Sequence, residues 1–167
     1  EYTIYRDENL KISNPFYCAT PETPIEGQTP PANAIAHRTE AVGEPVDIYF
    51  ECDFRFYQDK GSNTDNVINY VLGFFNNTAL LYNNENIKVQ VSQILVWTTT
   101  DPEAGFNTTS TVLNSFAPRM NTTTYIGDYA HFLSTRSLGG GVAYLLGNPC
   151  GTTKQFRTGV SAINNTY

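Results

Sequence analysis

The sequence predicts an α/β fold with a mixed, twisted sheet and flanking helices, and three observations lead to this prediction. Residues 46–54 alternate and are rich in aromatic and β-branched side chains, which is typical of a strand. Residues 64–82 carry apolar side chains at the spacing of an amphipathic helix. Patterns along the chain follow the order strand, helix, strand, helix, strand, strand, which favours a mixed sheet.

The first 45 residues differ from the remainder of the chain. Residues 14–45 hold most of the nine prolines and show little apolar periodicity. We therefore predict that residues 1–45 form an extended, proline-rich leader, similar to a propeptide linker. Residues 46–167 are predicted to form one folded domain, because a chain of 167 residues with 40% hydrophobic content can bury one sizeable core.

The first strand and the long helix are predicted from their apolar faces. Val46, Ile48 and Phe50 share one side of the strand. The helix takes its N-cap from one of residues 62–64. Its sheet-facing residues are predicted to be Val67, Val71, Phe74, Thr78 and Leu81, with Ile68, Phe75 and Tyr82 alongside.

The second half of the chain continues the alternation of strands and helices. Residues 88–97 are predicted to form a strand, and residues 109–119 a shorter helix after a polar loop. Two further strands are predicted over 129–134 and 141–146, with the last one at or near a sheet edge. The glycine run 139–141 starts this last strand where side chains are absent and another backbone can approach closely.

Charge and composition exclude some classes of partner. The chain has 10 basic and 16 acidic residues, so its net charge of -6 argues against nucleic acid and anionic membrane as partners. No apolar run reaches membrane-spanning length. The composition is typical of secreted chains, and we expect an extracellular monomer. Four glycosylation sequons, which an Asn- and Thr-rich chain also produces by chance, occur at Asn76, Asn107, Asn121 and Asn164.

Side chains that could carry catalysis are few. His37 and His131 are the two histidines of the sequence, and no His-Glu-x-x-His motif occurs, so this chain alone is not expected to assemble a catalytic zinc site. We interpret His37 as a solvated linker residue and His131 as a structural residue of a strand. No serine elbow motif is present, and no cysteine has a local histidine partner.

Three segments resemble the first two-thirds of a reprolysin-type (adamalysin-like) zinc metallopeptidase of the metzincin clan. They are VDIYFECDFRFY, the segment that ends in NIKVQVSQILVW, and LSTRSLGGGVAYLLGNPC. The resemblance covers residues 45–167. It implies the N-terminal subdomain of the peptidase, with a three-layer αβα arrangement, in a chain that ends before the zinc-binding helix.

The resemblance also implies a function for the glycine-rich strand. In the family this strand forms the upper rim of the cleft, and an extended peptide pairs with it antiparallel. The substrate-binding residues would be Gly140, Gly141, Val142, Ala143 and Tyr144. An edge strand suits this role because its backbone groups can pair with any extended peptide, whereas the alternative is a glycine turn before an ordinary strand.

The intact protein is thus expected to be a secreted zinc metalloendopeptidase, with a peptide or protein as its substrate. Zinc is not expected in this chain by itself, which should be inactive. The competing hypothesis is a non-enzymatic secreted binding or adhesion module, or a pseudo-peptidase, that uses the same exposed strand.

Further residues take implied roles from the resemblance. Asp47 and Asp128 match calcium ligands of the family, although two carboxylates alone are too few for calcium and structural or solvated carboxylates are the alternative. Cys150 matches a cysteine that forms a disulfide beyond the zinc helix. Cys18 lies where a latency thiol could reach the zinc, with a plain surface or paired cysteine as the alternative. Cys52 is expected in the core or in a disulfide.

Overall fold

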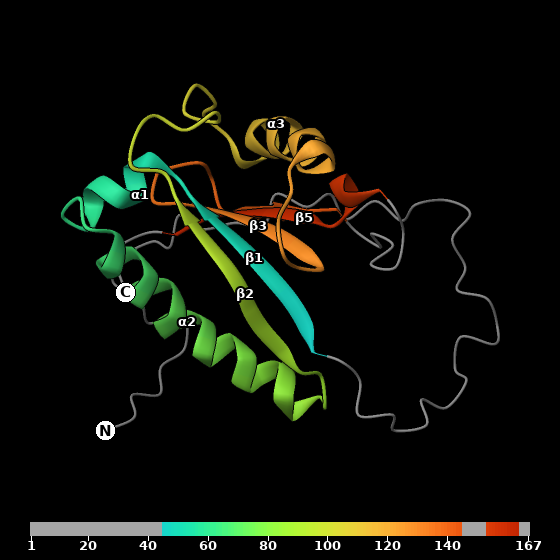
Figure 1. Cartoon of the computed structure of the whole chain (residues 1–167). Coiled ribbons are helices and arrows are strands. Elements are labelled where there is room, and N and C mark those ends of the chain that lie inside the picture. Colours follow the sequence, from blue (N-terminus) through green and yellow to red (C-terminus); the bar gives the residue numbers. More distant parts are fainter. Residues whose placement is uncertain (1–44, 145–152, 164–167) are drawn as a thin grey trace, which may run out of the picture.

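The computed structural model describes residues 45–144 and 153–163. Helices cover both faces of one sheet, which gives three layers (Figure 1). The predicted α/β class and mixed sheet are confirmed. The predicted leader lies outside the described residues, apart from Pro45.

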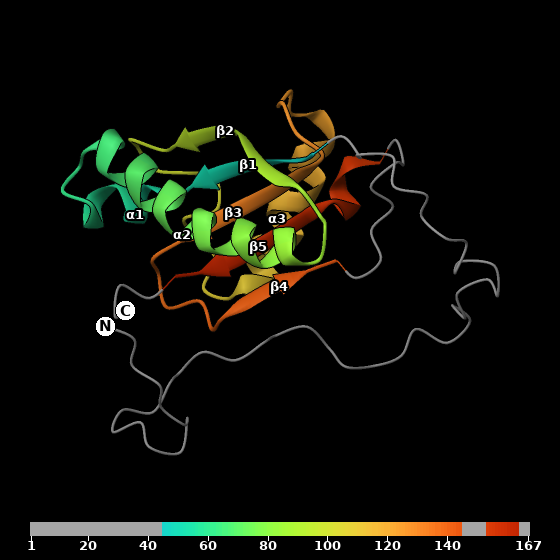
Figure 2. The ribbon, with the colours of Figure 1, turned by 90° about the horizontal axis from the view of Figure 1, so that it is seen from below.

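The sheet contains four parallel strands and one antiparallel strand. Its spatial order is β2-β1-β3-β5-β4. The parallel members are β1 (Val46–Cys52), β2 (Val89–Val96), β3 (Tyr129–Ser134) and β5 (Thr158–Ala162). The antiparallel strand β4 (Gly141–Ala143) pairs with β5 and lies at the end of the sheet (Figure 2). The edge position predicted for the strand over residues 141–146 is thus confirmed.

Side-chain caps start each of the longer helices. These helices are α1 (Phe54–Asp59), α2 (Thr64–Asn84) and α3 (Thr109–Thr122), and a short 3-10 helix, η2 (Lys154–Phe156), precedes β5. In each of α1, α2 and α3, the side chain before the first turn accepts a hydrogen bond from a free N–H group of that turn. The capping residues are Asp53, Asn63 and Thr108, respectively.

Two apolar cores lie on opposite faces of the sheet, because successive side chains of β1 point in opposite directions. Tyr49 belongs to the core under α3, with Phe116 and Phe132. Phe50 and Cys52 belong to the core under α1 and α2. The predicted sharing of one side by Ile48 and Phe50 is confirmed, since Ile48 packs against this second core.

The predicted face of α2 needs a correction. The buried row is Val67, Val71 and Phe75, whereas Phe74 is half-buried beside the same core. This row advances by four residues per step and turns away from Leu81, which is 68% exposed. Tyr82 is likewise exposed.

Three elements were missed, and β4 is shorter than predicted. No helix was predicted at α1, and the strand predicted over residues 46–54 extends to Phe54, where α1 begins. The elements η2 and β5 were not foreseen, and β5 inserts between β3 and β4. The strand β4 ends at Ala143 instead of residue 146, and residues 145–152 lie outside the described part of the chain.

Within the described residues, no helix combines the length and the hydropathy that a membrane span requires.

Candidate functional site

Among the residues that the structure describes, β4 lies at the end of the sheet and pairs with β5 on one side. Hydrogen bonds at both of its ends show which backbone groups face β5. Ala162 donates its N–H to the carbonyl oxygen of Gly140 at 2.8 Å, and Tyr144 donates its N–H to the carbonyl oxygen of Thr158 at 3.4 Å. The Gly140 carbonyl and the Tyr144 N–H are therefore directed toward β5.

The residues between these two bonds alternate in direction. Val142 is paired with Val160, and backbone groups of antiparallel strands point to the two sides in turn. Val142 thus shares the β5-facing direction. The N–H and C=O groups of Gly141 and Ala143 point away from the sheet, where they can pair with an added strand.

The glycine run serves the turn that leads into this edge. Gly139 and Gly140 have φ angles of +89° and +102°, in the region that favours glycine. Gly141 has ordinary backbone angles, but a side chain there would meet Ser161 Oγ and the Val160 carbonyl oxygen at 3.4 Å. The first two glycines are needed for the turn, whereas a Cβ at the third position would make ordinary van der Waals contacts with β5.

Side chains of β4 alternate between the two faces of the sheet. Val142 packs against the core under α3. Ala143 points to the opposite face, where its Cβ lies near Gly159. Tyr144, one residue beyond the strand, contacts the ring of Phe156 with the centroids 5.4 Å apart.

A buried ionic cluster lies between β1 and α3. Glu51 accepts hydrogen bonds from Trp97 Nε1 at 2.6 Å, Arg119 Nη2 at 2.7 Å and the Tyr49 hydroxyl at 3.0 Å. Glu103 accepts from Arg119 Nε and Nη2, both at 3.0 Å. One guanidinium group therefore holds two fully buried carboxylates. We name these five residues the Arg119 cluster.

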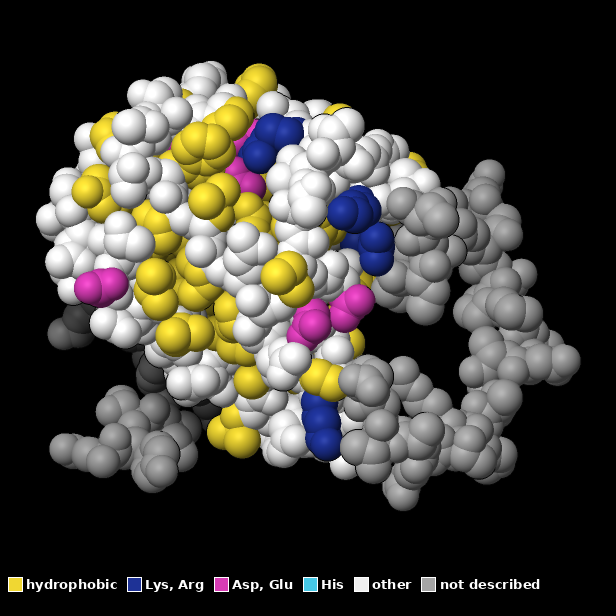
Figure 3. Space-filling view, in the orientation of Figure 1, with side chains coloured by type: hydrophobic (Ala, Val, Ile, Leu, Met, Phe, Trp, Pro, Cys, Tyr) yellow, Lys and Arg dark blue, Asp and Glu magenta, His cyan; other side chains and the backbone are white. Residues whose placement is uncertain are grey.

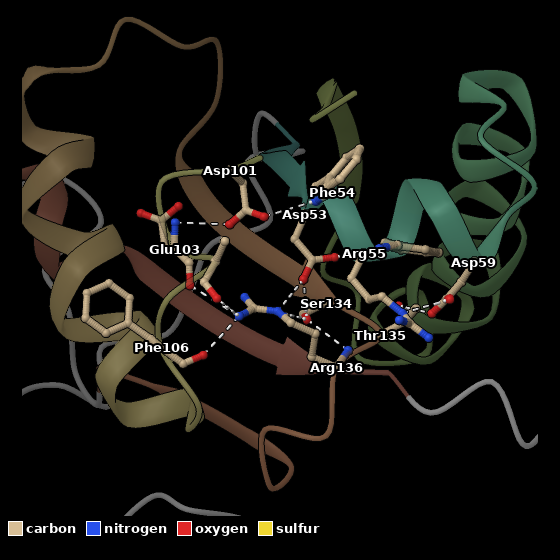
Figure 4. Close-up of polar contacts among 12 residues, drawn as sticks. Asp53, Phe54, Arg55, Asp59, Asp101, Glu103, Phe106, Ser134, Thr135 and Arg136 are labelled. Atoms are coloured by element: carbon tan, nitrogen blue, oxygen red, sulfur yellow. Dashed lines mark hydrogen bonds and ion pairs between the residues drawn. The ribbon is translucent and has the colours of Figure 1, made fainter. Parts of the chain in front are cut away.

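A second cluster ties the chain before the glycine turn to the ends of β1 and β3. Asp53 accepts hydrogen bonds from Ser134 Oγ and from Arg136 Nε, at 2.5 and 2.8 Å (Figure 4). Arg136 Nη1 donates to three carbonyl oxygens of the loop after β2. These belong to Glu103, Ala104 and Phe106. We name Asp53, Ser134 and Arg136 the Arg136 cluster.

Burial outweighs the local hydrogen bonds for one carboxyl group in each cluster. It raises the pKa of Glu103, against the hydrogen bonds and charge of Arg119, which favour the ionised form. It also raises the pKa of Asp53, against hydrogen bonds from Ser134, Phe56 and Arg136. The carboxylate oxygens are engaged within the protein, so the clusters serve to hold the loop and the strand ends in place.

His131 lies on β3, facing the side of the sheet that carries α2. Its Nε2 is 2.9 Å from Ser161 Oγ, and its ring lies edge-on to Phe50. A side chain at position 159 would come within 2.8 Å of His131 Nδ1, so Gly159 makes room for the ring. Burial lowers the pKa of His131 to about 4, which keeps the imidazole neutral at neutral pH.

Asp47 and Asp128 are brought together at the start of β1. Asp128 accepts the Asp47 N–H through Oδ2 at 2.8 Å, and its own N–H donates to the Asp47 carbonyl at 2.7 Å. Gln90 donates to Asp47 Oδ1 at 2.6 Å. These bonds suit a structural role for the pair, and calcium binding there stays a prediction.

The described residues do not fit a zinc ion. No group of three or more His, Cys, Asp or Glu side chains that could hold a metal occurs in the described ranges. Cys52 is a buried free thiol in the core, as one of its two predicted alternatives stated. Cys18, His37 and Cys150 lie outside the described residues.

Comparison with known proteins decides the family. A reprolysin-type family model, described as metallo-peptidase family M12, matches residues 43–167. The chain belongs to metallopeptidase family M12. The predicted resemblance is thereby confirmed at the level of the family.

The other comparisons add the fold alone. No curated protein shows a significant sequence match to the M12 chain. A solved structure described as "Structure of a chaperone-substrate complex" is similar, with a TM-score of 0.56 and 11% identity. The match covers 72% of the M12 chain but only 23% of that chain. At this identity the similarity concerns the arrangement of the backbone.

Sequence reasoning missed both charged clusters. Their members come from segments that are far apart in the sequence, such as Glu51 and Arg119, which are separated by 68 residues. One signal was present: Glu51 lies within an aromatic strand, although only 16% of the residues are charged. A lone charge in an apolar strand predicts a buried partner, but it does not identify that partner.

Proposed function

We propose that the M12 chain is part of a secreted zinc-dependent metalloendopeptidase and that β4 is the strand on which the peptide substrate lies. The observation that supports this role is the outward direction of the Gly141 and Ala143 backbone groups at an open end of the sheet. An extended peptide added there gains main-chain hydrogen bonds whatever its sequence. The proposed rim comprises the residues predicted from the sequence, 140–144.

Zinc binding is part of the proposed function of the intact protein, although the described residues do not fit a zinc ion. Since the described part of the chain lacks a fitting ligand set, we place the zinc ligands outside it. The chain by itself would bind peptides weakly and would not hydrolyse them. What its own residues contribute is orientation: β4 aligns the peptide backbone, and the Arg136 cluster holds the turn from which β4 starts.

The second candidate function is a non-enzymatic binding module. It rests on the same outward-facing backbone groups of β4, which can bind an extended peptide whether or not cleavage follows. Both functions use the same strand edge, so binding of a peptide to β4 supports either one. Zinc content and peptide cleavage distinguish them.

Peptide binding is tested by amide hydrogen exchange of the 167-residue chain. A blocked peptide of alternating Thr and Val should slow exchange at Gly141 and Ala143, whose N–H groups face outward. The amide of Phe50, in a central strand, is the internal control and should not change. Unaltered exchange at both edge amides under saturating peptide would contradict the substrate-rim role.

The catalytic part is tested on the full-length product of the gene. Zinc per molecule is measured by elemental analysis, and cleavage of a quenched peptide library is followed before and after chelation. One zinc per molecule with chelator-sensitive cleavage supports the peptidase. Peptide binding at β4 without zinc or cleavage would establish the binding module instead.

Secretion is the part of the proposal with a separate test. The sequons at Asn76 and Asn107 are exposed. At Asn121, by contrast, the side-chain Nδ2 donates a hydrogen bond to Gln155 Oε1 at 2.8 Å. This nitrogen is the atom to which a glycan would be attached. In a eukaryotic secretory host we expect glycans at Asn76 and Asn107 and an unmodified Asn121, as judged by mass spectrometry. A chain retained inside the cell without glycans would contradict this.

A further inference from the structure

Two aromatic rings lie exposed beside the open edge. Tyr144 is 36% exposed and Phe156 is 43% exposed, and they meet edge-to-face with an interplanar angle of 89°. Such a pair offers a T-shaped contact to a third ring. Exposed rings next to outward-facing backbone groups are suited to a ligand that is extended and carries a large apolar side chain.

The turn that carries Phe156 is held in place. Gln155 donates its N–H to Asn121 Oδ1 at 2.9 Å, while Asn121 donates back to the Gln155 side chain. Thr158 Oγ1 also donates to the Gln155 carbonyl oxygen at 2.7 Å. Phe156 therefore stands on a turn anchored to the end of α3, and the backbone of this turn needs little ordering when a ligand arrives.

The register of an added strand determines which ligand side chain meets these rings. Gly141 and Ala143 would exchange hydrogen bonds with an antiparallel peptide, so Val142 and Tyr144 would stand opposite its non-hydrogen-bonded residues. Directly opposed residues share a face of the sheet. The peptide residue opposite Tyr144 would thus lie on its face, two positions N-terminal to the residue opposite Val142.

We propose that Tyr144 and Phe156 form a subsite for an aromatic side chain of the peptide bound along β4. This inference rests on the proposed function of β4 and adds the chemistry of one ligand position. Cross-strand aromatic contacts contribute about 0.5 to 1.5 kcal/mol. We therefore expect the aromatic side chain to strengthen binding by roughly two- to tenfold over alanine.

The test uses two blocked pentapeptides and the 167-residue chain. Acetyl-Thr-Phe-Thr-Val-Thr-amide carries Phe two positions before the Val that would lie opposite Val142, and its partner peptide replaces Phe by Ala. Dissociation constants are measured from the NMR shifts of the Gly141 and Ala143 amides. The Phe peptide should bind roughly two- to tenfold more tightly.

Variants assign the preference to the ring pair. Phe156→Ala should abolish the difference between the two peptides, and Phe156→Leu should reduce it. Leu80→Ala, which removes a 61% exposed apolar side chain on α2, is the matched control and should preserve the difference. Since Phe156 is exposed, its variants should keep the amide spectrum of the folded chain.

The outcomes separate the subsite from the strand edge. If both peptides shift the edge amides with equal affinity, or if Phe156→Ala retains the preference, the aromatic subsite is wrong while peptide binding by β4 stands. If neither peptide shifts the Gly141 and Ala143 amides, the role of β4 fails and the subsite fails with it.

Discussion

The buried charged clusters and the open edge of β4 use polar groups in opposite ways. In the Arg119 cluster, both carboxylates are fully buried and each accepts hydrogen bonds from within the domain. At β4, by contrast, the backbone groups of Gly141 and Ala143 point away from the sheet. A buried polar group without a partner costs free energy, whereas an exposed one remains available for a ligand. In this domain the buried, hydrogen-bonded carboxylates therefore serve the architecture, and the outward-facing backbone groups of β4 are suited to binding.

The two regions are physically connected. Arg136 bonds Asp53 at the end of β1 and also the carbonyl of Phe106, and three residues after it the glycine turn begins. The closed clusters thus fix the point from which the open edge starts. A rigid support of this kind lowers the ordering cost of binding on the edge.

The largest effect is expected from breaking the Arg119 cluster. Arg119→Ala leaves Glu51 and Glu103 buried without their cation and should lower the free energy of unfolding by about 3 to 5 kcal/mol. Arg55→Ala is the matched control. It removes a surface pair with Asp59, in which Arg55 is 58% exposed, and should cost less than about 1 kcal/mol.

Chemical denaturation at neutral pH measures both variants. Adding Glu103→Gln to Arg119→Ala should recover part of the lost free energy of unfolding, because one unpaired buried charge is removed. Equal destabilisation by Arg119→Ala and Arg55→Ala would show that the Arg119 cluster is not a closed, buried unit.

Next in size is the apolar core under α2. Phe75→Ala should cost about 3 to 5 kcal/mol, since Phe75 is buried. Phe74→Ala should cost about 1 to 2 kcal/mol, because part of that ring stays in water in the folded chain. Leu81→Ala should be nearly neutral. Thermal or urea unfolding gives the order, and a larger loss for Phe74 than for Phe75 would restore the face predicted from the sequence.

A smaller, pH-dependent effect is expected from His131. Burial lowers its pKa to about 4, so the folded chain binds fewer protons than the unfolded chain, whose histidine has a pKa of about 6.5. The stability that the neutral His131 contributes to the folded chain is therefore lost as pH falls from about 6.5 toward 4. Burial raises the pKa of Asp53 and Glu103, whose contributions change with pH in the opposite direction.

The His131→Gln variant isolates this contribution, since Gln does not titrate and can still bond Ser161. Subtracting its melting temperatures from those of the wild type, between about pH 7 and 4, should show a difference that grows unfavourable for the wild type toward acid. A constant difference across this range would mean that His131 titrates normally in the folded chain.

Periodicity predicted most of the fold because it reports which side chains face a core. It located β1, β2, β3, α2 and α3, and it placed the last predicted strand at an edge. It missed α1 because Phe54 and Phe56 continue the alternation of β1. The boundary between β1 and α1 is set by Asp53, whose side chain accepts a hydrogen bond from the Phe56 N–H. Arg136, 83 residues later in the sequence, also donates a hydrogen bond to Asp53.

The candidate site was only partly predictable for the same reason. The backbone conformations that glycine allows depend on the residue itself, so the glycine run 139–141 predicted the turn and the edge strand after it. The strand β5 is short, and it contains Gly159 among small side chains, so its pattern was weak. Partner choice in the Arg119 cluster and the contact of Tyr144 with Phe156 depend on tertiary structure that no local pattern encodes.

The smallest expected effect on stability is the sharpest test of the open edge. Ala143→Pro removes an N–H that points away from the sheet, and proline is tolerated on edge strands at such positions. This variant should lower the free energy of unfolding by at most about 1 kcal/mol. It should also abolish the slowing of amide exchange in β4 by added peptide. Val142→Pro instead removes an N–H that faces β5 and should be clearly more destabilising, by roughly 3 kcal/mol. Unfolding curves and peptide titrations of the two variants give the comparison. If Ala143→Pro is the more destabilising change, the outward direction of that N–H is wrong and β4 does not present an open edge to a substrate.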